Sequence, residues 1–252
     1  MSGRKHVGHE QRSCVDLSGL WRDARFLKVK ISAVIPTLNE EALLPGLLED
    51  LNRQGAEVLV ADGGSRDQTA AIARRFGARV LTVPAGRGRQ LNAGASASTG
   101  EALFFVHADS IISRHAVAAI AGALGEGRFV GGAFSVAVRS ARPSVRFIYR
   151  VANWRSSRLF LPYGDQGIFC LRSVFEALGG YREIPFMEDI DFVRRLKRLG
   201  RTVILPQTMN TSVRRLEQEG VAYATLRNLT LAFLFLMGAS PYVLQKYYPH
   251  IR

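Results

Sequence analysis

The stretch EVLVADGGSRDQT, residues 57–69, joins an apolar strand to the start of a helix through a short glycine turn. Ser65 with Gln68 predicts a capping box, which places a helix start just after the glycines. A carboxylate at the carboxyl end of a strand is typical of the ligand-binding edge of an open α/β sheet. Asp62 would present its carboxylate to a base N–H, and Arg66 its guanidinium to charged oxygens. An ordinary turn with Asp and Ser as caps is the alternative.

Strands and helices alternate on both sides of this stretch, as expected for right-handed βαβ units around a mainly parallel sheet. The second half of the chain differs, because the alternating segment 129–138 favours an antiparallel or edge strand. We expect strands at 31–36, 57–61, 79–83, 102–106, 129–138, 167–171 and 202–205, and the first three helices at 41–53, 66–76 and 90–98.

Two further loops fall at the same predicted edge of the sheet. PTLNEE, residues 36–41, follows the first strand and carries a hydroxyl, an amide and two carboxylates. Helix capping by Asn39 and the acids explains that loop equally well. AGRGRQLNAGA, residues 85–95, places two arginines between glycines before a helix. Such a loop suits a diphosphate, because glycines let backbone N–H groups approach and the arginine forks grip oxygens.

The order PTLNEE, DGGSRDQT, GRGRQLNAG, HAD and MEDIDF resembles the inverting family 2 glycosyltransferases of the GT-A fold, over residues 31–215. Together with PYGDQGIF, residues 162–169, it resembles the small bacterial carotenoid (diaponeurosporenoate-type) or polyprenyl-lipid glycosyltransferases. The resemblance implies a GT-A-like, Rossmann-like α/β fold, with a mainly parallel central sheet, helices on both faces and C-terminal helices. It also implies a hexosyltransferase-type enzyme that moves a sugar, with inversion, from a UDP- or GDP-linked donor to a lipid-like hydroxyl or carboxylate acceptor.

The resemblance assigns the donor and metal sites residue by residue. His107-Ala108-Asp109 matches the family's DxD motif, which implies that Asp109 holds Mn²⁺ or Mg²⁺ and that His107 either bonds a ribose hydroxyl of the donor or joins Asp109 as a metal ligand. A neutral imidazole is an acceptable ligand for Mn²⁺, and the alternative is a histidine that only ends a strand. The donor-binding positions that the resemblance implies are Pro36, Thr37, Asn39, Glu40, Asp62, Arg66, Arg87, Arg89, His107 and Asp109.

The resemblance assigns Asp189 of PFMEDIDF as the catalytic base and Glu188 as its neighbour. Displacement at an anomeric carbon needs the acceptor hydroxyl to lose its proton as it attacks. Capping of the following helix is the alternative role for Asp189. Leu216 stands where processive family members carry an aromatic residue, which argues against polysaccharide synthesis. The predicted acceptor or diphosphate contacts are Asp165, Gln166, Arg214 and Arg215.

Charge and apolar runs point to an anionic partner. The chain of 252 residues has a formal net charge of +13, which favours polyanions. Aromatic–basic interleaving, zinc-ligand spacing and a helix-turn-helix are missing, so nucleic acid is not expected. The cysteines Cys14 and Cys170 form no disulfide pattern, as in a reducing compartment. We therefore expect a cytoplasmic protein on the cytoplasmic face of the cell membrane.

Two segments could meet that membrane. Arg142, Arg146 and Arg150 line up on a predicted helix beside Phe147, Val151 and Trp154, and residues 229–244 are uncharged but too short to span a bilayer. Packing of the stripe on the sheet, and burial of the run in a core or dimer contact, are the alternatives.

A catalytically silent nucleotide-sugar-binding module at the membrane is the rival function. We expect a basic tail at 1–28, a glycosyltransferase domain at 29–215 and a helical extension, associated with the membrane, at 216–252. Within the domain, residues 29–112 form the donor half and residues 113–215 the acceptor half.

Overall fold

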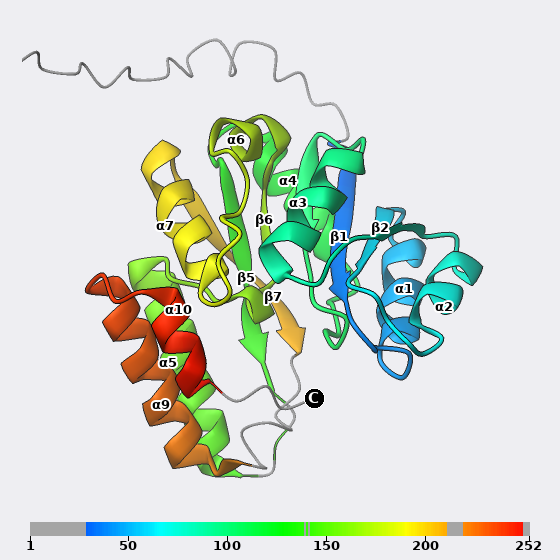
Figure 1. Ribbon diagram of the computed structural model, residues 1–252. Helices are drawn as coiled ribbons and strands as arrows, with labels where there is room; N and C mark the ends of the chain where they lie inside the picture. Colours follow the sequence, from blue (N-terminus) through cyan, green and yellow to red (C-terminus); the bar gives the residue numbers. More distant parts are fainter. Residues whose placement is uncertain (1–28, 139, 141, 211–218, 249–252) are drawn as a thin grey trace, which may run out of the picture.

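The computed structural model describes residues 29–138, 140, 142–210 and 219–248. One seven-stranded sheet organises them, in the order β3-β2-β1-β4-β6-β5-β7 (Figure 1). The strands are β1 Ile31–Thr37, β2 Glu57–Asp62, β3 Arg79–Thr82, β4 Ala102–Phe105, β5 Gly131–Ala137, β6 Ile168–Leu171 and β7 Thr202–Asn210. The helices are α1 Leu44–Arg53, α2 Thr69–Arg75, α3 Arg87–Ala97, α4 Ala116–Gly125, α5 Pro143–Leu159, α6 Arg172–Ala177, α7 Glu188–Leu199, α9 Val221–Leu236 and α10 Pro241–Leu244, with 3-10 turns η2 Gly164–Gln166 and η3 Gln245–Tyr247.

The sheet is mainly parallel, as predicted. β3, β2, β1 and β4 run parallel to one another, and β5 runs parallel to β7. β6 runs antiparallel to both of its neighbours, β4 and β5. Its amino end therefore lies at the edge where the parallel strands have their carboxyl ends.

Helices cover both faces of the sheet, which confirms the predicted layers. Alternate residues of a strand point to opposite faces. Accordingly Ile35 of β1 packs in a core cluster with α1, α2 and α4, whereas Val34 packs in a second cluster with α3, α6 and α7. Most of the largest buried side chains, among them Phe104 and Phe192, belong to these two clusters.

Several predicted boundaries were wrong, for reasons the structure makes clear. α2 begins at Thr69 rather than at residue 66, and no side chain caps its amino end, so the predicted capping box does not form. α3 begins at Arg87 rather than at residue 90. The strand predicted at 129–138 pairs antiparallel with β6 but is internal, because β7 covers its other side.

β7 is longer than the predicted segment 202–205 because an irregularity admits a proline. The pairing with β5 jumps from Phe134–Leu205 to Ser135–Thr208. Pro206 lies in the skipped pair of residues, where its missing N–H breaks no regular ladder bond.

The two C-terminal helices, α9 and α10, form a separate group with α5. Figure 1 shows α5, α9 and α10 gathered beside the sheet, apart from the layers that cover its faces. α9 buries only Ala224, Leu231 and Ala232 within the described structure. None of the helices among the described residues is both long and apolar enough to cross a membrane.

Candidate active site

The predicted site residues converge at one edge of the sheet because of the strand directions. β1, β2 and β4 end there, at Thr37, Asp62 and Phe105. β6 begins there, since Ile168 pairs with Phe105 across the antiparallel ladder. The turn η2, just before β6, therefore lies beside the residues that follow β4.

Asp62 organises the turn after β2. Its carboxylate is buried and accepts bonds from Thr37 Oγ1 at 3.2 Å, from Gly64 N–H at 3.2 Å and from Ser65 N–H at 2.9 Å. The Ser65 hydroxyl also donates to it. These four bonds match the acceptor capacity of a carboxylate. A ligand base would therefore have to replace one of these donors to bind Asp62.

The loops after β1 and β2 are joined by side chain to backbone bonds. Asn39 Oδ1 accepts from Arg66 N–H at 2.9 Å, and Asn39 N–H donates to Ser65 Oγ at 2.9 Å. Glu41 Oε2 accepts from Gln68 N–H at 2.9 Å. The alternative role as caps of α1 is wrong for Asn39, because the residue before that helix is Leu43 and no side chain caps it. Asn39 instead has φ 57°, in the left-handed region that Asn tolerates.

Gln90 is a structural residue of this edge that the sequence analysis did not identify. Its Nε2 donates to the carbonyls of Thr37 and Ala61, both at 2.8 Å, and its side chain is buried. Gln90, in the first turn of α3, therefore links the carboxyl ends of β1 and β2 through hydrogen bonds. A glutamine beside Leu91 on an inward helix face was the signal that could have revealed it.

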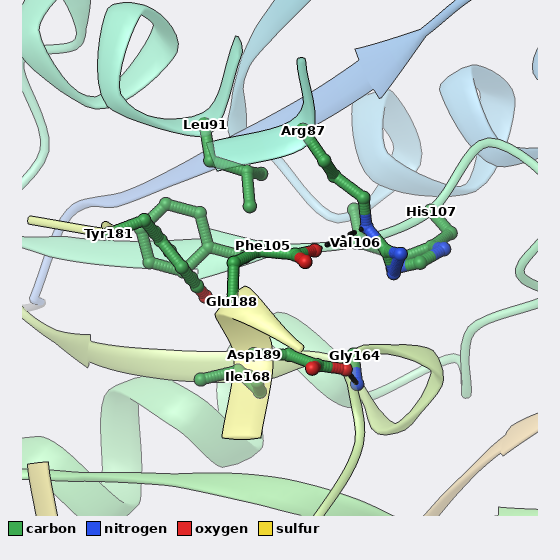
Figure 2. Close-up of a pocket in the computed structure, with 10 residues that line it drawn as sticks. All are labelled: Arg87, Leu91, Phe105, Val106, His107, Gly164, Ile168, Tyr181, Glu188 and Asp189. Carbon is green, nitrogen blue, oxygen red and sulfur yellow. Dashed lines mark hydrogen bonds and ion pairs between the residues drawn. The ribbon is translucent and has the colours of Figure 1, made fainter. Parts of the chain in front are cut away.

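Arg87 is the centre of the predicted donor and catalytic groups. Its Nε lies 2.9 Å from Glu188 Oε1, and its Nη2 lies 2.9 Å from His107 Nε2. Figure 2 shows the guanidinium between these two side chains, which come from α7 and from the turn after β4. A guanidinium can only donate, so His107 Nε2 must accept through its lone pair. His107 is therefore neutral in this arrangement.

Asp189 lies in the first turn of α7, next to the turn η2. Its Oδ2 accepts from Gly164 N–H at 2.7 Å, and its Oδ1 from Ile190 N–H at 2.8 Å (Figure 2). The alternative role as the cap of α7 is wrong, because Met187 precedes the helix, with φ 64°. A left-handed conformation at a residue other than Gly or Asn is strained. Strain is thus located beside both carboxylates of the pair.

Gly164 leaves the space in which these groups meet. A Cβ atom there would lie 2.9 Å from His107 Nε2, 3.1 Å from Arg87 Nη2 and 3.2 Å from Asp189 Oδ2. The cavity among the side chains drawn in Figure 2 measures about 10 Å³, about enough for one water molecule. Arg87, His107 and Asp189 are therefore closely packed around Gly164.

Burial and crowding of acids raise two carboxyl pKa values. Burial raises the pKa of Glu188, the nearby Arg87 opposes the rise, and Asp189 adds to it. Burial also raises the pKa of Asp165 to about 6, and the negative charges of Asp189 and Asp109 add to this rise. Several acids of the acceptor half therefore share one electrostatic environment.

The metal prediction rests on a small donor set. No group of three or more His, Cys, Asp or Glu side chains that could hold a metal occurs in the described part of the chain. His107 and Asp109 lie in one turn, where Ser110 N–H bonds to His107 O at 3.1 Å. One imidazole and one carboxylate suit Mn²⁺ if diphosphate oxygens and water complete the shell. The residues fit a metal that arrives with the donor.

An aromatic cluster packs against α7, the helix that begins with Glu188 and Asp189. Tyr181 stacks on Phe192 of α7 at 4.2 Å between ring centroids, and Phe105 of β4 meets Tyr181 edge-on at 5.0 Å. Phe175 packs against the same cluster. The start of α7 is thereby fixed against β4, so the distance between Asp189 and the turn after β4 is constrained by packing.

The remaining predicted residues have varied surroundings. Gln166 differs from its predicted role, because it is 1% exposed and its amide bonds to Ser156, to Tyr163 N–H and to Phe134 O, as a structural link requires. Arg89 forms an exposed ion pair with Glu183 at 3.0 Å. Pro36 is half-buried in β1, Glu40 N–H bonds to Thr69, and Arg66 is exposed. Arg214 and Arg215 lie outside the described residues.

The C-terminal residues contact the loop that precedes α7. The ring of Tyr248 lies 4.8 Å from that of Phe186, the residue before Met187. Arg227 of α9 stacks on Tyr248 at 5.1 Å and pairs with Glu219 at 2.6 Å, where both charged side chains are 8% exposed. A chain of direct contacts therefore joins α9 to the loop before α7, the helix whose first turn carries Glu188 and Asp189.

Comparison with known proteins gives one family and several relatives. The model of glycosyl transferase family 2 matches residues 32–173. The 4,4'-diaponeurosporenoate glycosyltransferase of Staphylococcus haemolyticus is 39% identical over 101 residues, 36% of this chain and 27% of that protein. A PGL/p-HBAD biosynthesis glycosyltransferase of Mycobacterium tuberculosis is 36% identical over 106 residues, 38% of this chain and 41% of that protein. The matched part of the chain thus spans between about a quarter and two fifths of these relatives.

Solved structures share the fold at low identity. The mannosyltransferase PcManGT of Pyrobaculum calidifontis, in complex with GDP-Man and Mn²⁺, has a TM-score of 0.59 at 22% identity, and the likeness covers 74% of this chain and 58% of that one. S. aureus TarS 1-349 in complex with UDP-GlcNAc has a TM-score of 0.56 at 19% identity, with 73% and 59% covered. The predicted α/β fold of the GT-A type is confirmed.

Proposed function

The chain belongs to glycosyl transferase family 2, whose model matches more than half of it, and we propose that it moves a sugar from a nucleotide diphosphate to an acceptor with inversion. The observation that carries this proposal is the placement of Asp189 against Gly164, beside Arg87 and His107. A carboxylate, a guanidinium and the turn that carries His107 and Asp109 then meet where three parallel strands end. Such a set suits group transfer from a diphosphate.

In the proposed reaction Asp189 acts as the base. The acceptor O–H gives its proton to the Asp189 carboxylate, and the oxygen attacks the anomeric carbon of the sugar. The bond from that carbon to the diphosphate breaks, and the nucleoside diphosphate leaves with the electron pair. Attack opposite to the leaving group inverts the anomeric centre. A carboxylate acceptor is already ionised at neutral pH and would not need this base.

The donor is assigned to the edge formed by the loops after β1 and β2. Asp62, Thr37 and Asn39 would surround the nucleoside, and Arg87 would exchange its contacts with Glu188 and His107 for diphosphate oxygens. His107 and Asp109 would hold the metal, which when bound would neutralise charge on the leaving diphosphate. PcManGT was solved with GDP-Man and Mn²⁺, and TarS with UDP-GlcNAc, which supports a GDP- or UDP-linked donor.

A thermal-shift screen of GDP- and UDP-sugars with and without Mn²⁺ tests this proposal. A donor at about 100 times its Kd adds about 2.7 kcal/mol to the free energy of unfolding, which raises Tm by roughly 5–10 °C for a chain of this size. The matching donor should also be hydrolysed slowly in the absence of acceptor. A shift without turnover would favour the silent binding module, and no shift with any nucleotide sugar would contradict the proposal.

We also propose that the acceptor is lipid-like and that the chain rests on an anionic leaflet. Phe147, Val151 and Trp154 on α5 are 64%, 47% and 61% exposed, so the alternative in which this stripe packs on the sheet is wrong. Arg146 and Arg150 are exposed beside them, whereas Arg142 precedes the helix instead of lying within it. The relatives named for diaponeurosporenoate and PGL/p-HBAD synthesis are in line with a lipid-like acceptor.

The uncharged run of residues 229–244 adds to this surface. It folds as the end of α9 and as α10, with most of its large side chains exposed. The exposed large apolar side chains of this part are Tyr223, Leu226, Leu229, Phe233, Leu234, Met237, Tyr242, Val243 and Tyr247. An apolar face of this extent beside basic side chains suits the interface of a membrane.

Co-sedimentation with vesicles tests the membrane proposal. Each basic residue near an anionic surface contributes about 1 kcal/mol. Changing Arg142, Arg146 and Arg150 to Gln together should therefore weaken binding by about 100-fold, and added salt should weaken the binding of the unchanged chain. Binding that ignores both salt and the three substitutions would contradict an electrostatic attachment.

A further inference from the structure

The carboxyl ends of α5 and α9 approach the side of α7 (Figure 1). Side chains of these helices and of Leu161 line a groove there. It encloses about 510 Å³ and opens widely to the surface. Within the described part of the chain, its lining combines cations with leucines and contains no acid. The lining residues are Leu159, Leu161, Arg194, Lys197, Arg198 and Leu236.

The cations of this groove differ from the neighbouring Arg195. Arg195 Nε pairs with Asp191 one turn away at 2.8 Å. Among the described residues, no ion pair involves Arg194 or Arg198. Arg194 and Arg198 are four residues apart on α7, so both guanidinium groups can lie on the same side of that helix. Like charges at this spacing repel, so two unpaired arginines here favour a bound anion.

Two ordinary roles for these cations explain only part of the set. Lys197 Nζ donates to the carbonyl of Leu159 at 2.6 Å, which satisfies the end of α5. Lys197 and Arg198 also lie in the last turn of α7, where basic residues complement the helix dipole. Arg194 lies outside that last turn and is half-buried, so neither role applies to it.

The apolar part of the groove continues into the proposed membrane surface. Leu159 is 48% exposed at the end of α5, and Leu234 and Met237 are 40% and 72% exposed at the end of α9. A ligand here would meet guanidinium groups on one side and leucines on the other. This combination matches an amphiphile with an anionic head and an apolar chain, because arginine forks bind phosphate oxygens in pairs.

We propose that the groove between α5, α7 and α9 binds the phosphate headgroup of an anionic membrane lipid. This inference rests on the proposed membrane attachment and names a structured site within it. Asp189 and Arg198 are nine residues apart on α7, about 14 Å at 1.5 Å per residue. The headgroup therefore binds outside the catalytic cluster, on the same helix as the proposed base. A lipid held there fixes the orientation of that helix relative to the bilayer.

The test uses a short-chain phosphatidylglycerol below its micelle concentration, titrated into the full chain by calorimetry. We expect binding of one lipid per chain, weakened at least tenfold when Arg194 and Arg198 are both changed to Gln. The pair Arg74→Gln and Arg75→Gln removes the same charge from the exposed end of α2 and should leave this binding unchanged. The pair Arg146→Gln and Arg150→Gln should weaken vesicle binding but retain the one-to-one lipid site.

Three outcomes overturn the inference. Inorganic phosphate that binds as tightly as the lipid would make the groove a phosphate site. If the groove variant and the α2 control lose the same lipid affinity, the loss is caused by the change in net charge and not by a site in the groove. If no one-to-one complex with the lipid is detected, the proposed site does not exist. The thermal shift with a nucleotide sugar is measured on the same variants. If it is retained while lipid binding fails, the lipid site is wrong and the proposed donor function is unaffected.

Discussion

The donor half and the acceptor half of the site use their acids differently. In the donor half, Asp62 is surrounded by four donors from its own turn and the neighbouring strand end. In the acceptor half, Glu188 and Asp189 lie beside Arg87, Asp165 and one another, and burial raises the pKa of Glu188 and of Asp165. Asp62 holds its own turn in place, whereas the other acids form a cluster whose charge is opposed by Arg87 at Glu188 and by Arg155 and Arg87 at Asp165.

The difference teaches where stability and reactivity are located. Carboxylates that accept several backbone bonds hold a turn in place and are costly to lose. Crowded acids beside a strained residue raise the free energy of the folded state, and packing elsewhere in the fold must offset this cost. We therefore expect the loss of Asp62 to act mainly on folding stability and the loss of Asp189 to act mainly on turnover.

Asp189→Asn should give the largest effect, a loss of turnover by about 100-fold or more with a hydroxyl acceptor. Asparagine can still accept the bond from Gly164 N–H, so donor affinity and Tm should change little. Steady-state kinetics and a donor thermal shift measure the two quantities. A carboxylate acceptor would show a much smaller loss, so the same variant distinguishes the two acceptor classes.

Asp191→Asn is the matched control, two residues further along α7. Asp191 pairs with Arg195 at 2.8 Å and with Arg182 at 3.2 Å, away from Gly164. Turnover should stay within a few-fold of the original chain. Equal losses in both variants would mean that Asp189 acts through the stability of α7 and not as a base.

Asp62→Ala tests the donor half and should remove about 2–3 kcal/mol of folding stability, because two backbone N–H groups and two hydroxyls lose their acceptor. Chemical denaturation measures the change. Asp50→Ala, which removes an ion pair with Arg53 at the surface of α1, should cost less than about 0.5 kcal/mol. Unchanged stability in Asp62→Ala would contradict the proposed division between the halves.

Gly164→Ala should reduce turnover by about tenfold while Tm stays nearly constant. The added methyl group meets the ends of Arg87, His107 and Asp189, which can move aside, but displacement of reacting groups by a fraction of an ångström is costly for catalysis. Gly122→Ala in α4, where the space is open, should leave turnover unchanged. If Gly164→Ala keeps full turnover, the close packing around Gly164 has no catalytic role.

Asp165 gives the smallest expected effect, on the order of 1 kcal/mol, because its carboxyl is partly exposed and screened by water. Burial raises its pKa from 3.8 to about 6, so the folded chain holds this proton at higher pH than the unfolded chain does. The associated stability is present below about pH 4 and is lost as the pH rises through 6. Asp165→Asn, titrated by Tm between pH 4 and 7, should lack this fall, and an unchanged profile would exclude Asp165 as its source.

The sequence predicted the sheet, its layers and the edge at which the site lies, because those depend on local patterns. The apolar runs at β1, β2 and β4 and the polar turns after them are short-range signals. The roles of the polar side chains were less predictable. Ser65 reads as a helix cap from its spacing, yet its hydroxyl binds Asp62 and accepts from Asn39 N–H, because the neighbouring loop competes for it.

Contacts between distant segments were outside the reach of spacing arguments. Gln90 bridges the ends of two strands, and Tyr248 meets Phe186 across 62 positions. Arg87 was expected to bind a diphosphate, but its contacts with Glu188 and His107 depend on the packing of α3 against α7 and β4. Contacts of this kind depend on tertiary structure, and no periodic pattern in the sequence predicts them.

The contact of Tyr248 with Phe186 is a direct physical route between α9 and the loop before α7. Arg227 of α9 holds Tyr248, and Phe186 lies two residues before Glu188. If binding of α9 to a bilayer changes the free energy of the catalytic loop, binding at that loop must change the affinity for the bilayer by the same factor. If the donor and the bilayer favour the same conformation of that loop, a chain loaded with donor would bind the bilayer more tightly than an empty one, and the bound fraction would report the state of the active site.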